Sequence, residues 1–366
     1  MKIGSKSYRT IWTTDDNGHV YVIDQTRLPF ALEIAELRSS ADAERAIRTM
    51  IVRGAPLIGA TAAYGMALAM REDNSDKHLA DSAKFLRAAR PTAVNLAWAV
   101  EDMVAHLRPI SAPQRAAAAF QRAAMICDAD VAQCEAIGAH GAAAIRAMAS
   151  DKKRTINILT HCNAGWLACV DWGTALAPIY KAHNEGISVH VWVDETRPRN
   201  QGAFLTAYEL GAHGVPHTVI ADNLGGHLMR EGRVDLAIVG SDRTCINGDV
   251  CNKVGTYLKA LAARDNGVPF YVALPSTTID WRMKSGSEIP IEERDAREMT
   301  HISGVTADGR LETVRVVPET SAALNLGFDV TPARYVTGLI MERGICAANR
   351  EGLLSLFPER RQEAAE

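Results

Sequence analysis

The second half of the chain alternates between short apolar runs and windows of helical periodicity, and this alternation limits the possible folds most strongly. The runs predicted as strands are residues 155–160, 188–193, 217–220, 235–239 and 269–274. Helical windows lie between and after them, at residues 201–211, 254–265 and 331–343. Strands that alternate with helices form parallel sheets covered on both faces. We therefore predict an α/β fold with a doubly wound, mostly parallel, Rossmann-like sheet.

The first part of the chain follows a mainly helical pattern. Residues 8–13 and 19–23 are rich in β-branched and aromatic residues and flank Asn17-Gly18, which predicts a small β-hairpin. Ser40 is the predicted N-cap of the first helix. Further helices are predicted at residues 57–71, 79–89, 92–107 and 113–150, with Pro91 separating the second and third of these. The length of 366 residues suits two domains. We place a helical domain with a hairpin at 1–150 and a Rossmann-like catalytic domain at 151–366.

Charge and cysteine content exclude several classes of protein. A net charge of −3 argues against nucleic acid as a partner, because a phosphate-backbone binder needs an excess of Lys and Arg on one face. No apolar run is long enough to cross a membrane, and the N-terminus lacks the apolar core of a secretory signal. Seven cysteines, an odd number without a C-x-x-C pair, favour a reducing cytoplasm over a disulfide framework. The eleven histidines do not cluster with ligand spacing, so we predict no metal.

Polar or small residues follow all five predicted strands, which indicates one shared site. In an open α/β sheet, ligands bind outside the carboxyl ends of the strands. Cys162 lies just past the first run, where a thiol can act as nucleophile, acid or hydrogen-bond donor; the alternative is a buried structural thiol. Asp242 follows the fourth run, where apolar surroundings would raise the carboxyl pKa and allow it to donate a proton. A salt bridge to Arg243 or a helix N-cap is the alternative for Asp242.

Two further segments have the character of anion sites. Residues 247–255 resemble a turn that enters a helix, whose amides and Lys253 would attract an anion, although Lys253 could also be a solvated first-turn lysine. Arg53-Gly54-Ala55-Pro56 places a guanidinium and a Gly before a Pro at a helix start, and the alternative is a plain helix-to-helix turn. Motifs for P-loop, dinucleotide-binding, zinc-protease and α/β-hydrolase sites are absent from the sequence.

Taken together, these strings resemble the methylthioribose-1-phosphate isomerase family over residues 8–357. The matching segments are Arg53-Gly54-Ala55-Pro56-Leu57-Ile58-Gly59, Thr160-His161-Cys162-Asn163, Glu195-Thr196-Arg197-Pro198 with Gln201-Gly202, Asn247-Gly248-Asp249-Val250 with Asn252-Lys253, and Phe328-Asp329-Val330-Thr331-Pro332. The fold is shared with regulatory subunits of a translation-initiation exchange factor and with ribose-1,5-bisphosphate isomerases. Ser241 and Thr277 depart from the usual pattern of the family.

The resemblance implies an aldose–ketose isomerase that converts 5-methylthio-α-D-ribose 1-phosphate to 5-methylthio-D-ribulose 1-phosphate in methionine salvage. It implies Cys162 and Asp242 as the catalytic pair. It also suggests a homodimer that binds a small sugar phosphate. Its substrate-binding positions fall on Arg53, Gly54, Ala55, Arg90, Gln201, Asn252 and Lys253. With the cysteine and histidine patterns above, we expect a cytoplasmic protein without cofactor or metal.

Ester formation at the anomeric oxygen closes the usual route through a free aldehyde, so the ring C–O bond must break instead. We expect Asp242, kept neutral by an apolar site, to give the ring oxygen its proton, and Cys162 to lie near C1 and C2. Hydrogen then moves from C2 to C1, as a hydride or as a proton. The alternatives are an isomerase of a related 1-phosphopentose (5-deoxyribose 1-phosphate or ribose 1,5-bisphosphate), a non-catalytic metabolite-sensing regulatory subunit, and a Schiff-base lyase that uses Lys253.

Overall fold

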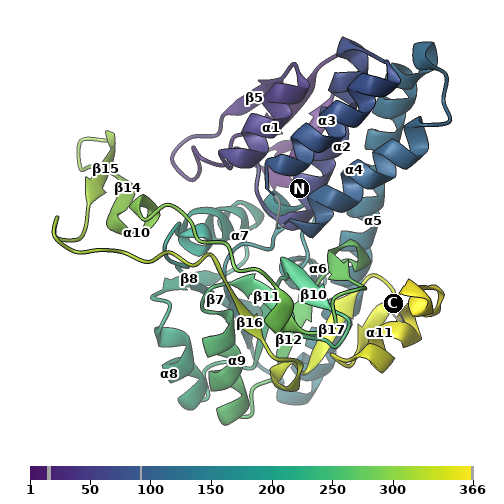
Figure 1. Cartoon of the computed structure of the whole chain (residues 1–366). Helices are drawn as coiled ribbons and strands as arrows, with labels where there is room; N and C mark the ends of the chain where they lie inside the picture. The colour runs from purple at the N-terminus through teal and green to yellow at the C-terminus, as the bar shows by residue number, and fades with distance from the viewer. Residues whose placement is uncertain (15–17, 91–92, 364–366) are drawn as a thin grey trace.

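The N-terminal part of the computed structural model combines small antiparallel sheets with a group of helices (Figure 1). The structure describes residues 1–14, 18–90 and 93–363. The predicted hairpin is confirmed as β3 (Ile11–Thr13) and β4 (Val20–Ile23), to which β5 (Ile34–Leu37) adds a third strand. The Asn17 turn and the Pro91 break lie outside the described residues. A short pair, β1 (Lys2–Ile3) and β2 (Lys6–Ser7), precedes the hairpin.

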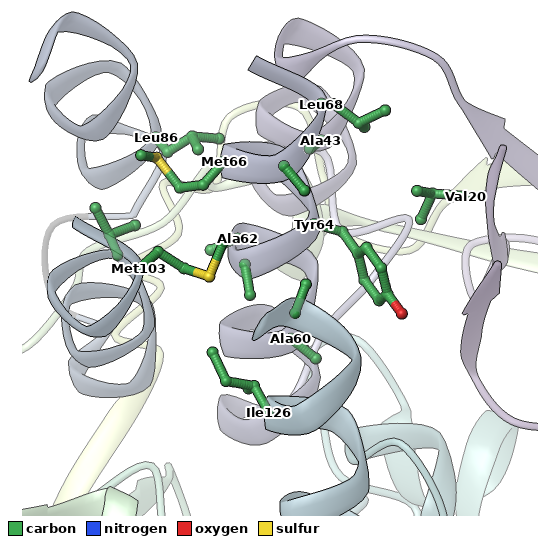
Figure 2. Packing of buried hydrophobic residues seen from close by; sticks show 14 of the residues in the cluster. Val20, Ala43, Ala60, Ala62, Tyr64, Met66, Leu68, Leu86, Met103 and Ile126 are labelled. Atoms are coloured by element: carbon green, nitrogen blue, oxygen red, sulfur yellow. The ribbon is translucent and has the colours of Figure 1, made fainter. Parts of the chain in front are cut away.

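Five helices follow in the predicted order. They are α1 (Ser40–Arg48), α2 (Ala55–Glu72), α3 (Asp76–Ala88), α4 (Val94–Leu107) and α5 (Ala112–Lys152). The N-cap of α1 is Ser39 rather than Ser40, because the Ser39 side chain accepts the hydrogen bond from the Asp42 amide. The central helix α2 is buried on nearly all sides. Its small residues let the neighbouring helices approach, and Figure 2 shows Met66 beside Leu86, Met103 reaching toward Ala62, and Tyr64 turned toward the β4 side of the cluster.

The predicted doubly wound sheet is confirmed, with seven strands in the order β18-β17-β12-β9-β6-β7-β8. Its strands are β6 (Ile156–Thr160), β7 (Val189–Asp194), β8 (His217–Ile220), β9 (Leu236–Val239), β12 (Phe270–Ala273), β17 (Gly338–Met341) and β18 (Gly344–Cys346). All neighbours are parallel except β17 and β18. The chain fills the sheet from β6 toward β8 and then from β9 toward β17, so the topological switch point lies between β6 and β9.

Helices cover both faces of this sheet because its strands are apolar on both sides. Ile158 joins the cluster formed with α5 and α6 (Ala177–Asn184), to which α7 (Ala207–His213) also contributes. Its neighbour Leu159 points the opposite way, toward α8 (Leu224–Arg230) and α9 (Thr256–Asp265). Among the described residues, no helix is both long and apolar enough to cross a membrane.

The segment after β12 departs from the sequence prediction. Residues 331–343 were predicted to be a helix, and this is wrong: β16 (Phe328–Thr331) ends there and the buried strand β17 follows. Pro332 and the apolar run of β17 explain the difference, because a short buried strand and a buried helix turn look alike in sequence. A second sheet, in the order β13-β10-β11-β16, sits beside the first. It comprises β10 (Arg243–Cys245), β11 (Val250–Lys253), β13 (Ile279–Asp280) and β16.

The remaining elements lie at the surface. A hairpin of β14 (His301–Val305) and β15 (Leu311–Arg315) follows the short helix α10 (Arg297–Thr300) and stands out from the body of the molecule (Figure 1). The chain ends with α11 (Arg350–Leu356), which packs beside β18. The predicted window at 201–211 forms a π-helical turn, Gly202–Thr206, that continues into α7.

Candidate active site

One cavity lies at the switch point, where the ends of β6 and β9 meet the start of α2. It encloses about 690 Å³ of space, open solvent included. All nine residues predicted for the site line it: Arg53, Gly54, Ala55, Arg90, Cys162, Gln201, Asp242, Asn252 and Lys253. They come from the start of α2 and the turn before it, from the loops after α3, β6, β7 and β9, and from β11. The fold therefore gathers residues up to 200 positions apart, between Arg53 and Lys253, around one space.

Cys162 is held in a constrained backbone conformation just beyond β6. Its φ of 67° lies in the left-handed region, which residues other than glycine rarely adopt. Two threonines fix its peptide groups: the Cys162 amide donates to Thr196 Oγ1 at 2.8 Å, and Thr206 Oγ1 donates to the Cys162 carbonyl at 2.7 Å. Burial raises the pKa of the Cys162 thiol, and the positive charge of Arg53 opposes that rise. The thiol is thus neutral, suited to donating a hydrogen bond or a proton.

Asp242 follows β9, on the other side of the switch point from Cys162. Burial raises its pKa above the ordinary value of 3.8, although Lys253 and Arg90 pull the pKa down. The negative charge of the Asp242 carboxylate also raises the pKa of Cys162, so the two groups interact electrostatically across the cavity. A carboxyl group with a raised pKa retains its proton at higher pH than an exposed one, which suits a general acid.

The position of Lys253 corrects the sequence prediction. Residues 247–255 do not form a turn into a helix: β11 contains Lys253, and α9 begins only at Thr256. Antiparallel pairing of β11 with β10 and β16 stabilises the extended backbone. Lys253 Nζ donates to the Gly327 carbonyl at 2.8 Å and lies 4.7 Å from the centre of the Phe328 ring. Burial lowers its pKa, and the acidic groups of the cavity oppose that change.

The start of α2 lines one side of the cavity and has the features of an anion site. Gly54 has a φ of 88°, and a Cβ placed on it would lie 2.5 Å from Ala168. The turn therefore requires glycine. No side chain caps this helix terminus, and Pro56 lies in its first turn. The free amides and helix dipole at Gly54–Ala55 favour a phosphate group, and the adjacent Arg53 supplies a guanidinium.

Two buried polar atoms in the cavity lining have no hydrogen-bond partner among the described residues. They are Arg90 Nε and Gln201 Oε1. Arg90 Nη2 donates to Glu292 at 2.9 Å, so the pair is anchored while Nε stays free. Asn252, the third polar binding candidate, donates from Nδ2 to Thr256 at 3.0 Å. Because buried polar groups normally find partners, the two unpaired atoms indicate that this cavity accommodates a polar ligand.

Sequence reasoning gave no role to several residues at the site. Arg53 donates two hydrogen bonds to Asn163, and Asn163 in turn donates to Glu209. Arg294 and Met50 also line the cavity. Glu209 was the hardest to find, because an isolated Glu inside a helical window carries no sequence signal. Asn163 had one signal, its position at a strand end.

Within the described part of the chain, two clusters have donor atoms that could hold a metal ion. Asp130, Cys134 and Cys169 lie close together in a buried group, and so do His161, Asp194 and Asp222. In the second group both nitrogens of His161 already face oxygen atoms, of Asp194 at 2.8 Å and of Val254 at 2.9 Å. Lys259 Nζ also lies 3.2 Å from Asp194. This group therefore forms an internal ion network rather than an open coordination site.

The fold and site agree with comparisons to known proteins. Residues 51–348 match the model of the Initiation factor 2 subunit family. A methylthioribose-1-phosphate isomerase from Paramagnetospirillum magneticum is 65% identical over 98% of this chain and 100% of its own length. The chain therefore belongs to the Initiation factor 2 subunit family and, within it, to the methylthioribose-1-phosphate isomerases.

Solved structures show the same relationship. The 5-methylthioribose 1-phosphate isomerase of Pyrococcus horikoshii has a TM-score of 0.82 and 36% identity, and the match covers 97% of each chain. A structure described as translation initiation factor eIF-2B subunit delta, from A. fulgidus, has a TM-score of 0.78 and 36% identity over 96% of this chain and 100% of that one. Enzymes and proteins described as initiation-factor subunits thus share this fold, and the site residues must decide the function.

Proposed function

We propose that the protein converts 5-methylthio-α-D-ribose 1-phosphate to 5-methylthio-D-ribulose 1-phosphate, an isomerase step of methionine salvage. The observation that carries the proposal is the pairing of Asp242 and Cys162, both with raised pKa, in a cavity that also contains the guanidinium of Arg53. A purely ligand-sensing site would need the cationic residues but not the acid and the thiol. The 65% identity to a protein named as this isomerase supports the same activity.

In this proposal the phosphate of the substrate binds Arg53, Arg90 and the amides of the Gly54–Ala55 turn. Two guanidinium groups and a helix N-terminus give strong charge-assisted hydrogen bonds to phosphate oxygens. Gln201 and Asn252 then hold the sugar hydroxyls. The unpaired Arg90 Nε and Gln201 Oε1 supply a donor and an acceptor for these contacts.

Asp242 gives its proton to the ring oxygen while the bond between that oxygen and C1 breaks. The departing oxygen becomes a hydroxyl, and the electron-poor C1 keeps its phosphate ester. Lys253, buried beside the acid, stabilises the carboxylate that Asp242 leaves behind. A raised pKa lets a carboxyl group keep its proton closer to neutral pH, so that it can act there as a general acid.

Hydrogen then moves from C2 to C1, and the C2 hydroxyl loses its proton as the ketone forms. The proton balance closes, because the proton given to the ring oxygen is matched by the one released at C2. Cys162 contributes a neutral thiol beside these carbons. The burial of its surroundings keeps water from trapping the electron-poor intermediate.

Product analysis tests the proposal directly. Incubation of the purified protein with 5-methylthioribose 1-phosphate, followed by NMR, should show 5-methylthioribulose 1-phosphate. Parallel incubations with 5-deoxyribose 1-phosphate and ribose 1,5-bisphosphate should turn over more slowly. Faster conversion of either one would assign the protein to that substrate instead, and no conversion of any would favour a regulatory role.

We also propose a cytoplasmic homodimer. The hairpin region exposes apolar side chains, with Val305 and Val314 about half exposed and Leu324 at 66%. Apolar surface that extends along a projecting hairpin is typical of a protein contact. Light scattering of the purified protein should give twice the mass of the 39.6 kDa chain, and a monomer mass would contradict the proposal.

A further inference from the structure

Glu209 is a fully buried carboxyl group that the proposed chemistry does not use. It lies on α7, outside the set of residues that line the cavity, with no exposed surface. Its two oxygens accept three hydrogen bonds: from Asn163 Nδ2 at 2.6 Å, the Trp166 amide at 2.8 Å and the Tyr180 hydroxyl at 2.8 Å. Burial raises its pKa to about 7. Burying a charge is costly, so a carboxylate kept here with its own set of donors indicates a specific role.

The bond to Asn163 determines which way the Asn163 amide faces. An ionised carboxylate only accepts hydrogen bonds, so it selects the NH₂ side of the amide. The carbonyl side, Oδ1, then faces Arg53, whose Nη1 donates to it at 2.5 Å. Arg53 Nη2 donates to the Asn163 backbone carbonyl at 2.7 Å. With the amide reversed, NH₂ would face the guanidinium and this two-point grip would be lost.

The same amide is linked to the backbone of Cys162. Asn163 Nδ2 also lies 3.1 Å from Thr206 Oγ1, and Thr206 Oγ1 donates to the Cys162 carbonyl. The orientation of one amide therefore bears on both Arg53 and the left-handed turn at Cys162.

The backbone leaves a space that fits this carboxylate closely. Gly165 lies against it, and a Cβ built on Gly165 would be 1.9 Å from Glu209 Oε2. Because a side chain at that position would displace the carboxylate, the loop after β6 and the Glu on α7 fit each other only in this form.

We propose that Glu209 is a positioning residue that orients Arg53 for phosphate binding through the amide of Asn163. This inference rests on the proposed function, in which Arg53 holds the phosphate. Glu209 does not line the cavity. Its effect is therefore expected in substrate affinity, carried by Arg53, more than in the chemical step.

The test replaces Glu209 with the isosteric amide, Glu209→Gln. A glutamine has only one acceptor oxygen. Two donors, the Trp166 amide and the Tyr180 hydroxyl, share one carboxylate oxygen in the wild type, so the glutamine oxygen is expected to stay with them and its NH₂ group to face Asn163. At pH 8 we expect KM for 5-methylthioribose 1-phosphate to rise about tenfold, with kcat changed less than about threefold, as for loss of a charge-assisted contact. Inorganic phosphate should inhibit the variant about tenfold less strongly and raise its Tm less than it raises that of the wild type.

Tyr180→Phe is the matched control, because it removes one donor to the same carboxylate and leaves the bond to Asn163 in place. It should lower Tm while KM and phosphate inhibition stay at wild-type values. A second comparison uses Arg53→Ala: if Glu209 acts through Arg53, adding Glu209→Gln to that variant should leave its KM within about twofold. A multiplicative increase would contradict the inference.

The outcomes separate the two proposals. A wild-type protein that does not convert the substrate overturns the proposed function, and the Tm shift with phosphate then still tests Glu209. An active wild type with an unchanged KM in folded Glu209→Gln overturns the inference alone. If Glu209→Gln does not fold, Asn163→Ala provides the same comparison, with a rise in KM expected and an unchanged KM contradicting the role.

Discussion

The backbone amide of Asp242 donates a 3.0 Å hydrogen bond to the carbonyl of Cys251. This bond ties the end of the β9 loop to β11, the strand that carries Asn252 and Lys253. The proposed acid and the cation beside it thus keep a fixed separation, because they belong to one hydrogen-bonded unit. Burial raises the pKa of Asp242 and lowers that of Lys253, and the charge of each group opposes the change in the other. The strength of this opposition depends on the distance between the two groups, which the hydrogen bond holds constant.

Asp242→Asn should abolish turnover and leave substrate binding nearly intact. An amide cannot supply the acidic proton, so kcat is expected to fall by about a thousandfold or more, while KM or calorimetric affinity changes little. Near-normal kcat would remove Asp242 from the role of acid. The Tm at neutral pH should hold or rise. Because the folded pKa is raised, the ionised carboxyl destabilises the folded state above pH 3.8, and the amide lacks that penalty.

Asp249→Asn is the matched contrast, seven positions along the chain. Burial acts to raise the pKa of its carboxyl group, but hydrogen bonds donated by the amides of Ala333 and Gly286, at 2.9 and 3.0 Å, outweigh this and lower the pKa. The variant should lose about 1–3 kcal/mol of unfolding free energy, measured by urea titration. In the wild type, this stabilisation by Asp249 is fully present above the pKa that its carboxyl group has in the unfolded chain. It is lost as the pH falls through the lower pKa of the folded state. An unchanged urea midpoint would show that the carboxylate is not needed.

The pH profile of kcat should fall on its alkaline side as Asp242 ionises. The acid acts only when protonated, and the raised pKa moves this loss of activity to higher pH than an exposed Asp would show. Using kcat avoids the ionisation of free substrate phosphate. The same alkaline limb should remain in Cys162→Ser. A rate that increases with pH across neutrality would assign the titration to a base instead.

Cys162→Ser should reduce kcat by about a hundredfold, because a hydroxyl is a weaker acid and a less polarisable donor than a thiol. KM should change little, since the phosphate contacts remain. Cys134→Ser is the control: that buried thiol lies outside the cavity lining and should affect Tm more than rate. If Cys162→Ser keeps the wild-type rate, the thiol is structural.

Gly54→Ala should impair both folding and phosphate binding. The left-handed φ of 88° and the 2.5 Å approach to Ala168 both oppose a methyl group. The strain alone is expected to cost about 1–3 kcal/mol, measured as a lower urea midpoint. Gly186→Ala is the control, because φ is 79° there and a Cβ would meet nothing within 4 Å. Its effect on stability measures the cost of the left-handed backbone alone. Equal effects in the two variants would show that contact with Ala168 is unimportant.

The sequence was sufficient to predict five of the seven strands of the sheet, because the pattern of each strand is local. Cys162 and Asp242 could be singled out by their positions at strand ends, whereas Arg90, Gln201 and Asn252 were predicted only from the resemblance to the family. The five apolar runs became β6, β7, β8, β9 and β12, and parallel strands bring their ends to one edge. Lys253 was misplaced because its strand is defined by pairing with β16, about 75 residues away, which no local pattern reveals. The division of the chain near residue 150 stays a prediction.

The constraints that hold the site in place were beyond sequence reasoning. Left-handed backbone at Met50, Cys162, Thr196 and Asn200 depends on tertiary contacts that outweigh the local preference of each residue. The contact between Asn163 and Glu209 spans 46 positions and involves two ordinary polar residues. The sequence motifs shared with the family identified these segments, but only the folded structure shows which of their residues are in contact.

Helix α5 has a mechanical consequence for the molecule. Phe120 and Ile126, in the first half of the helix, pack in the hydrophobic cluster around α2. Ile137 and Ile145, in its second half, pack in the cluster that lies against β6 and β7. A single rod of 41 residues is thus embedded in both interiors. Neither interior is complete without it, so a fragment that retains the cavity must be nearly as long as the whole polypeptide.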